Sequence, residues 1–398
     1  METRTQSYIH SNELPGRVTR SRLILIASTT RADWGILSPL ARALADRDDC
    51  EVKVLASNMH LDPQRGRTID EIRADGFDPI VALMPFNLIT SEDAAAAAGD
   101  LQKSGAKALS SLNPDVLVLL GDRFEVLSIA SAANIMRIPI VHISGGEITQ
   151  GAFDDSYRHA LTKLSTLHLT ATERYRQRVI QLGEQPEMVI NCGALGVQNV
   201  LSDAILSRSE LEKDLGWDFG ENAMLVTVHP ETVSQQDIIT PTLQALNRFP
   251  QSKLLITYPN NDPAGRYIID AIETYAKSQP EGRIKLVPSL GRLRYHSALR
   301  CVKMVVGNSS SGVVEVPSVG IPTVNIGNRQ YGRIAASSVI SCDAENDAIT
   351  DAIKNAFEFD CTGVENPYYK ADTLQLMVDA IAKTPLEKLR EPKRFYDL

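Results

Sequence analysis

Short apolar runs alternate with helix-favouring stretches along most of this chain. A strand buried on both faces of a parallel sheet reads as an almost continuous apolar run, and the segment DVLVLLG at 115–121 is of this kind. The alternation is typical of a parallel sheet covered by helices, so it predicts an α/β fold. The apolar runs predict strands at 22–28, 51–57, 115–121, 138–144, 167–172, 223–229, 253–259, 284–289, 303–309 and 321–327.

The strand pattern lapses once, which indicates a domain boundary. Near 193–215 a Gly-Ala-Leu-Gly sequence leads into a charged helix, and the alternation then resumes. The sequence therefore predicts two βα halves in series. Helices are expected near 35–47, 91–111, 123–136 and 156–166. We expect a first Rossmann-like domain at 1–195, a second at 196–375, and a C-terminal helix or tail at 376–398.

Composition narrows the class of protein. The chain of 398 residues is 43% apolar and 23% charged, and its length is enough for two ordinary domains. A net charge of −8 argues against non-specific nucleic-acid binding, which normally needs a basic surface. The five cysteines are far apart and form no CxxC pair, which argues against structural zinc and fits a reducing compartment. No apolar run approaches the roughly 18 residues of a membrane span, so we expect a cytoplasmic protein without a membrane partner.

Polar groups follow the predicted strands of the first half. Ligands bind at the carboxyl ends of strands in open α/β sheets, so these positions matter most. Arg31 follows the first run at the start of a helix, where backbone N–H groups and a guanidinium suit a phosphate. The alternative is an ordinary turn with a surface arginine. Asp122 and Arg123 follow the most apolar run and can point into a cleft, although Asp122 is equally suited to cap the next helix.

The segment HISGGEITQGAFDDSYRH gathers several titratable groups after the fourth run. Its double glycine permits a sharp turn, and Glu147 follows at once. Asp154 and Arg158 stand four residues apart, as do Asp155 and His159, so each pair can touch on one helix face. Convergent carboxylates can supply a base for proton transfer at carbon. The alternative is a capped helix with weak surface ion pairs.

The second half carries the features of an anion site. His229 ends a predicted strand, although a lone histidine more often has a structural role. The run at 303–309 opens into Asn-Ser-Ser-Ser-Gly and then a helix, which together offer hydroxyls and free N–H groups to a phosphate. There is no Walker loop and no GxGxxG sequence. The candidate ligands are Ser309, Ser310, Glu315 (for a ribose diol, unless it is simply solvated), Arg329 and Arg333.

The ordered set RADWG, GDRFE, HISGGE, FDDSYRHALTKLS, HP, GNSSSGVVE and GNRQYGR resembles one enzyme family. The chain is similar, from about residue 22 to about residue 380, to the hydrolysing sugar-nucleotide 2-epimerases of sialic or legionaminic acid synthesis. The resemblance implies a glycosyltransferase-B architecture, in which two Rossmann-like domains face a cleft. It also implies a homodimer or homotetramer that uses no cofactor and no catalytic metal.

The reaction implied by the resemblance begins with anti elimination of the nucleoside diphosphate, which gives a 2-acetamidoglucal. Water then adds and releases a free sugar of the N-acetylmannosamine type. The expected substrate is UDP-N-acetylglucosamine, or a 2,4-diacetamido-6-deoxy sugar linked to UDP or GDP. The alternatives are a non-hydrolysing UDP-N-acetylglucosamine 2-epimerase, a glycosyltransferase of the same fold, and a sugar-nucleotide sensor without turnover.

The resemblance also implies roles for individual residues. Several family members have a catalytic glutamate before the double glycine, where this chain has Ser144, so we expect the missing carboxylate at Glu147. By motif, the catalytic positions are Asp122, Glu147, Asp154 and His229, the diphosphate ligands are Ser309, Ser310 and Arg329, the ribose ligand is Glu315, and further cleft residues are Arg31, Arg123 and His159.

Overall fold

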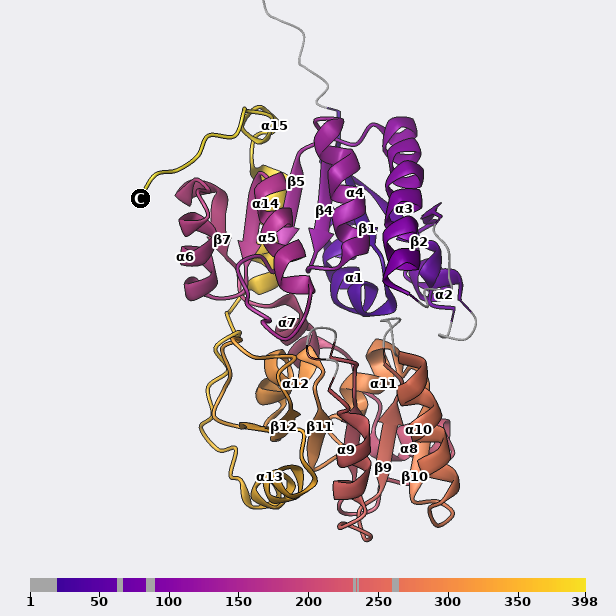
Figure 1. The fold of residues 1–398 in the computed structure, drawn as a ribbon. Helices are drawn as coiled ribbons and strands as arrows, with labels where there is room; N and C mark the ends of the chain where they lie inside the picture. The colour runs from indigo at the N-terminus through magenta and orange to yellow at the C-terminus, as the bar shows by residue number, and fades with distance from the viewer. Residues whose placement is uncertain (1–19, 63–66, 84–89, 232–233, 235, 260–264) are drawn as a thin grey trace, which may run out of the picture.

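Two α/β domains, stacked one on the other, make up the protein (Figure 1). The computed structural model describes residues 20–398 except 63–66, 84–89, 232–233, 235 and 260–264, and it describes no side chain for Arg31 or Asn58. Each domain is built on one parallel sheet, and helices cover both faces of each sheet. The predicted fold class is therefore confirmed.

The first sheet has seven strands in the order β3-β2-β1-β4-β5-β6-β7, and all its pairings are parallel. The order runs outward in both directions from β1 and β4, so the carboxyl ends of these two strands mark the switch point where ligands bind in such sheets. The strands are β1 Arg22–Ser28, β2 Cys50–Ser57, β3 Ile80–Ala82, β4 Val116–Leu120, β5 Ile140–Ile143, β6 Leu167–Thr170 and β7 Val189–Asn191.

The second sheet has six parallel strands in the order β10-β9-β8-β11-β12-β13. Its switch point lies between β8 and β11, which correspond to β1 and β4 of the first sheet. The strands are β8 Met224–Thr227, β9 Leu254–Thr257, β10 Ile284–Val287, β11 Met304–Gly307, β12 Thr323–Ile326 and β13 Val339–Cys342.

Helices occupy most of the intervals between strands. The α-helices are α1 Arg31–Ala45, α2 Ile69–Ala74, α3 Ser91–Leu112, α4 Phe124–Ile135, α5 Asp154–Leu164, α6 Glu173–Gln181, α7 Leu195–Ser202, α8 Arg208–Leu215, α9 Ile239–Leu246, α10 Gly265–Lys277, α11 Gly291–Ala298, α12 Ser310–Val314, α13 Asn346–Glu358, α14 Thr373–Lys383 and α15 Leu386–Leu389. Short 3₁₀ helices lie at Asn58–Leu61, Pro186–Met188 and Val316–Val319. No helix among the described residues is long and apolar enough to cross a membrane.

Every predicted strand is present, although most are a few residues shorter than the apolar run that indicated them. Three further strands, β3, β7 and β13, were not predicted. Each has only three or four residues and lies at the outer part of its sheet, so its sequence carries little periodic signal. The helix expected near 156–166 begins earlier, at Asp154.

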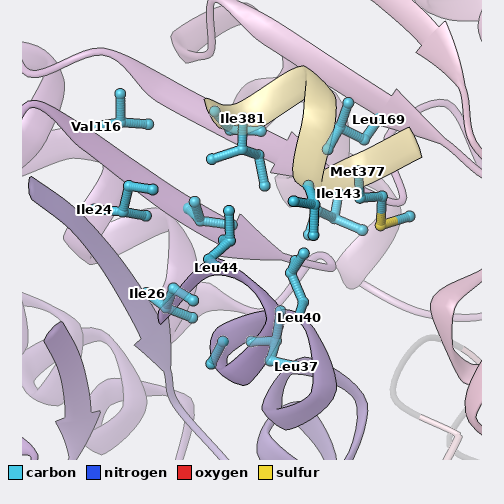
Figure 2. Close-up of a cluster of buried hydrophobic side chains, with 14 of the residues drawn as sticks. Ile24, Ile26, Leu37, Leu40, Leu44, Val116, Ile143, Leu169, Met377 and Ile381 are labelled. Carbon is cyan, nitrogen blue, oxygen red and sulfur yellow. The ribbon is translucent and has the colours of Figure 1, made fainter. Parts of the chain in front are cut away.

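The C-terminal part of the chain returns to the first domain. Helix α14, yellow in Figure 1, packs beside the first sheet rather than the second. Its side chains Met377 and Ile381 are fully buried in the same core as Ile24, Leu40 and Ile143 (Figure 2). The apolar face of α14 therefore completes the core of a domain whose sheet ends almost two hundred residues earlier.

Shortening Ile381 tests this packing. Because the side chain is fully buried, we expect Ile381→Ala to lower the free energy of unfolding by about 3 kcal/mol through lost contacts and the cavity left behind. Chemical denaturation measures the change. The control Tyr369→Ala removes a side chain that is 57% exposed and should change stability by less than about 0.5 kcal/mol. Equal effects of the two variants would contradict the role of α14.

Candidate functional site

The loops at the carboxyl ends of the two sheets meet between the domains. The loop that follows β5 contacts the loop that follows β12, and the backbone N–H of Gln150 donates to the carbonyl oxygen of Tyr331 at 3.1 Å. These loops, which carry several of the predicted residues, form a seam between the two domains.

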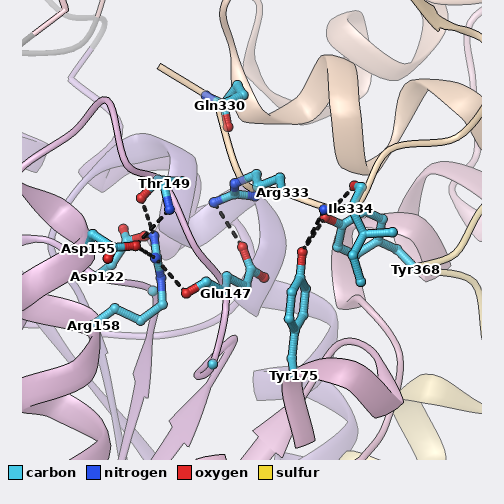
Figure 3. Close-up of polar contacts among 12 residues, drawn as sticks. Asp122, Glu147, Thr149, Asp155, Arg158, Tyr175, Gln330, Arg333, Ile334 and Tyr368 are labelled. Atoms are coloured by element: carbon cyan, nitrogen blue, oxygen red, sulfur yellow. Dashed lines mark hydrogen bonds and ion pairs between the residues drawn. The ribbon is translucent and has the colours of Figure 1, made fainter. Parts of the chain in front are cut away.

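The turn after β5 is tightly held. Ser144 has a φ of 69° and Gly146 a φ of 82°. A Cβ atom at Gly146 would lie 2.4 Å from the carbonyl oxygen of Tyr175, so only glycine fits against helix α6 at this point. The turn directs the following residues, from Glu147 onward, toward the second domain (Figure 3).

Arg158 is the centre of a buried polar cluster (Figure 3). Its side chain is fully buried, and it forms an ion pair with Asp122, which lies in the loop after β4. It also donates to Asp155 at 3.0 Å and to Thr149 Oγ1 at 2.8 Å. A further bond of 3.0 Å reaches the carbonyl oxygen of Glu147. One guanidinium thus joins the loop after β4, the loop after β5 and the start of α5.

The cluster keeps Asp122 ionised. Burial alone would favour the neutral acid, but the positive charges of Arg158, Arg333 and Arg329 hold the pKa of Asp122 below its usual range. Two of these arginines belong to the second domain, so the electrostatic environment of Asp122 depends on both domains.

Glu147 forms an ion pair with a residue of the second domain. Its Oε2 lies 2.8 Å from Nη2 of Arg333, which is in the loop after β12, and both side chains are almost fully buried. Close by, the backbone N–H of Ile334 donates to the hydroxyl of Tyr175 at 3.1 Å, and the hydroxyl of Tyr368 donates to the carbonyl oxygen of Ile334.

The second domain contains a cavity of about 230 Å³ that its first-domain neighbours partly close. Hydroxyl groups at the start of α12 line it, with Ser309 Oγ 3.2 Å from Ser311 Oγ and Tyr295 OH 2.6 Å from Ser311 Oγ. Arg329 lies on its wall and donates to the carbonyl oxygen of Asn308 at 3.2 Å. Hydroxyls beside a guanidinium form a surface suited to a phosphate.

Glu315 lies in the same cavity and is almost completely buried. Burial raises the pKa of its carboxyl group, an effect that the nearby His296 reduces. A Cβ atom at Gly196 would lie 2.5 Å from Oε1 of Glu315, so glycine is needed for the carboxyl group to occupy this position. A buried carboxyl group that lines such a cavity is suited to accept hydrogen bonds from a diol.

His229 is fixed by its backbone. The side chain of Asn308 accepts from the His229 N–H at 2.7 Å and donates to the His229 carbonyl oxygen at 2.9 Å. This paired contact joins the ends of β8 and β11, and His229, which is 5% exposed, lines the cavity beside them.

A larger groove, of about 1080 Å³, adjoins the cavity. Arg329 lines both spaces, and Asp154 and Arg123 line the groove from the first domain. Much of the remaining wall is apolar and comes from helices α3 and α4 and from α9 and α10. A ligand with a phosphate in the cavity can extend past Arg329 into the groove, which Asp154 also lines.

The predicted residues thus fall into distinct groups. His229, Ser309, Ser310, Glu315 and Arg329 line the cavity, and Asp154 and Arg123 line the groove. Asp122 and Glu147 line neither space and form ion pairs with Arg158 and Arg333. His159 is 3.5 Å from Asp155, and burial lowers its pKa despite that neighbour. The side chain of Arg31 lies outside the described residues.

Some interpretations need correction, and some residues were missed. Arg158 forms ion pairs with Asp122 and with Asp155, three residues before it, and Asp154 lines the groove. Arg333, which was a candidate ligand of the anion site together with Arg329, pairs with Glu147. The central role of Arg158 and the pairing of Asn308 with His229 were not predicted, because both depend on contacts between segments distant in sequence.

Among the described residues no group of three or more His, Cys, Asp or Glu side chains is arranged to hold a metal ion.

Comparisons with known proteins agree on one family. A family model described as UDP-N-acetylglucosamine 2-epimerase matches residues 42–382. A Campylobacter jejuni protein named GDP/UDP-N,N'-diacetylbacillosamine 2-epimerase (hydrolyzing) is 34% identical over 328 residues, 81% of this chain and 84% of the relative. The Escherichia coli polysialic acid biosynthesis protein P7 is 34% identical over 390 residues, 94% of this chain and 97% of the relative.

A solved structure supports the fold. The UDP-GlcNAc 2-epimerase from Neisseria meningitidis, bound to UDP-GlcNAc, matches with a TM-score of 0.75 over 91% of this chain and 100% of that chain. At 16% sequence identity, this similarity concerns the fold alone.

Replacing Arg158 with glutamine tests the cluster. Because the change leaves Asp122 without its nearest cation, we expect its pKa to rise and the protein to lose about 3 kcal/mol of stability at neutral pH. A lowered carboxyl pKa stabilises the fold above the unfolded value of about 3.9, and this stability is lost as the pH falls through the folded value. The free energy of unfolding should therefore fall less on acidification in Arg158→Gln than in the wild type.

Carbon NMR of labelled aspartate measures the pKa of Asp122, and denaturation at neutral pH and at several pH values below about 4, where this group titrates, measures the stability. The control Arg248→Gln removes a surface ion pair with Asp347 in the second domain and should change neither quantity. An unchanged Asp122 pKa in Arg158→Gln would exclude this role of the guanidinium.

Proposed function

This chain belongs to the UDP-N-acetylglucosamine 2-epimerase family, and on that basis we propose that it is a hydrolysing sugar-nucleotide 2-epimerase. The observation that carries the proposal is that two binding spaces lie next to each other between the domains. A cavity suited to a nucleoside diphosphate in the second domain adjoins a groove that Asp154 of the first domain lines. The relative named as a hydrolysing enzyme supports release of a free sugar over retention of a sugar nucleotide.

The nucleotide occupies the cavity in this proposal. Glu315 accepts hydrogen bonds from the ribose diol, and Ser309, Ser310 and Arg329 bind the diphosphate. The sugar then extends past Arg329 into the groove. The structure of a UDP-GlcNAc 2-epimerase bound to UDP-GlcNAc supports a ligand of this size in such a fold.

The reaction begins with elimination. Asp154 removes the proton at C2, and the electrons of that C–H bond form a double bond between C1 and C2. The bond from C1 to the diphosphate oxygen breaks, and its electron pair stays with the leaving group. Arg329 and the serine hydroxyls stabilise the charge that grows on the diphosphate, a type of interaction worth several kcal/mol.

Hydration completes the reaction. Water adds across the double bond, which places a hydroxyl group on C1 and a proton on C2 from the opposite face. His229 follows β8 and lines the cavity, and we assign it to assist departure of the diphosphate and addition of water. Asp122, which follows β4 and pairs with Arg158, positions groups in the cleft. Arg123 contributes to the groove wall.

The substrate we propose is a UDP-linked or GDP-linked N-acetylated sugar, either UDP-N-acetylglucosamine or a 2,4-diacetamido-6-deoxy sugar. The apolar helices that line much of the groove support a substrate with acetamido and methyl groups, and so does the name of the Campylobacter relative. The family resemblance supports a cytoplasmic homo-oligomer that forms the free sugar for nonulosonic acid synthesis.

A substrate panel tests the proposal. The protein is incubated with UDP-N-acetylglucosamine and with UDP- and GDP-linked 2,4-diacetamido-6-deoxy sugars, without any acceptor, and NMR identifies the products. We expect free 2-epimeric sugar and nucleoside diphosphate from at least one substrate. A requirement for an acceptor would indicate a glycosyltransferase, an epimeric sugar nucleotide would indicate a non-hydrolysing enzyme, and binding without turnover would indicate a sensor.

Replacing Asp154 with asparagine tests its role as the base. Because the amide cannot accept the C2 proton, we expect kcat to fall by at least about 100-fold while UDP still binds in the cavity of the second domain. Turnover of the preferred substrate and calorimetric titration with UDP measure the two quantities. Full turnover by a folded Asp154→Asn variant would remove this residue from the mechanism.

A further inference from the structure

The ion pair between Glu147 and Arg333 lies at a point where the two domains meet. Glu147 belongs to the loop after β5 and Arg333 to the loop after β12, and their charged atoms are 2.8 Å apart. The Glu147 side chain is 6% exposed and that of Arg333 is 9% exposed, so both charges have left bulk water. Each charge is therefore neutralised by the other, because a buried unpaired charge is strongly destabilising.

The other side of the same loop supports the Arg158 cluster. The carbonyl oxygen of Glu147 and the hydroxyl of Thr149 accept hydrogen bonds from Arg158, whose guanidinium binds Asp122. The side chain of Glu147 thus faces the second domain while its backbone contacts the arginine that holds Asp122 (Figure 3). A shift of this loop would move two of the acceptors that orient Arg158.

We propose that Glu147 is a positioning residue that couples contact between the domains to the arrangement of Asp122, and that it is not the proton acceptor at C2. When the second domain approaches, Arg333 binds Glu147 and fixes the loop from Glu147 to Thr149. The fixed loop then holds Arg158, and Arg158 holds Asp122. The kinetic part of this inference rests on the proposed epimerase function.

Geometry supports positioning over proton transfer. A general base must come within hydrogen-bond reach of the proton that it removes. Asp154 lines the groove, whereas Glu147 lines neither the groove nor the cavity and one of its oxygens is held by Arg333. Arg333 also adds to the positive charge that keeps Asp122 ionised, so the pair affects Asp122 through charge as well as through the loop.

Two other contacts at this seam provide independent reporters. The N–H of Gln150 donates to the carbonyl oxygen of Tyr331, and the N–H of Ile334 donates to the hydroxyl of Tyr175. The Gln150 bond requires contact between the loops after β5 and β12, and the Ile334 bond requires contact between the loop after β12 and helix α6 of the first domain. Hydrogen exchange at these two amides therefore reports on the contact whether or not the protein turns over a sugar nucleotide.

A double-mutant cycle tests the coupling. We expect Glu147→Ala and Arg333→Ala each to lower kcat by about 10- to 100-fold, because misplaced groups lose rate even when they are present. The double variant should lose no more than the worse single variant, because both changes remove the same contact. The affinity for UDP, which binds in the second-domain cavity, should change by less than about 3-fold. Losses that multiply, or an unchanged kcat in Glu147→Ala, would overturn the proposal.

Two conservative variants separate positioning from proton transfer. Glu147→Gln keeps a hydrogen-bond acceptor for Arg333, so it should retain more activity than Glu147→Ala; a proton acceptor would be equally disabled by both changes. Should the alanine variants fail to fold, the comparison of Glu147→Gln with Arg333→Lys replaces them, and both should lower kcat more than they change UDP affinity. Glu173→Gln, which removes an exposed ion pair with Arg176 on α6, is the control and should keep the wild-type kcat.

Hydrogen exchange distinguishes failure of this inference from failure of the proposed function. In Glu147→Gln and Arg333→Lys we expect faster exchange at Gln150 and Ile334, with no change in the core strands and none in the control. If the wild type turns over no sugar nucleotide but these two amides respond, the coupling stands and the proposed function fails. If turnover is present and the amides do not respond, the coupling is wrong.

Discussion

The burial of the Arg158 guanidinium is the constraint on which the rest of the site depends. Moving such a charge out of water costs several kcal/mol unless anionic and polar partners surround it. Those partners come from three segments, with Asp122 after β4, Glu147 and Thr149 after β5, and Asp155 on α5. The first domain can therefore fold around this charge only when the carboxyl ends of its central strands and the start of α5 converge at one place.

The second domain contains the cavity proposed for the nucleotide and the arginines that border it. Its strands β8 and β11 are joined at their ends by the two hydrogen bonds between Asn308 and His229, and the nucleotide-sized cavity lies beside them. Arg329 borders both the cavity and the groove, while Arg333 pairs with Glu147. The second domain thus supplies the proposed nucleotide ligands, and the first supplies the proposed base Asp154, so the proposed chemistry requires both. This division explains why a single domain with either set of residues would be incomplete.

Much of the fold, and part of the site, could be predicted from the sequence. The apolar runs gave the central strands because a doubly covered parallel sheet excludes polar residues, whereas the short outer strands β3, β7 and β13 carried too few residues for such a signal. Residues directly after strands, such as Asp122 and His229, were predicted from that position. The partners of Arg158 and the pair of Glu147 with Arg333 were not, since they depend on how loops far apart in the chain meet in space.

The exchange of hydrogen at C2 tests the central claim most directly. The protein is incubated in D₂O with the sugar nucleotide that it turns over best, and NMR follows both the free sugar and the recovered substrate. Elimination followed by hydration predicts a free 2-epimeric sugar that carries deuterium at C2 in every molecule released. A released sugar that retains its original hydrogen and configuration at C2 would indicate simple hydrolysis of the glycosyl phosphate and would contradict the account.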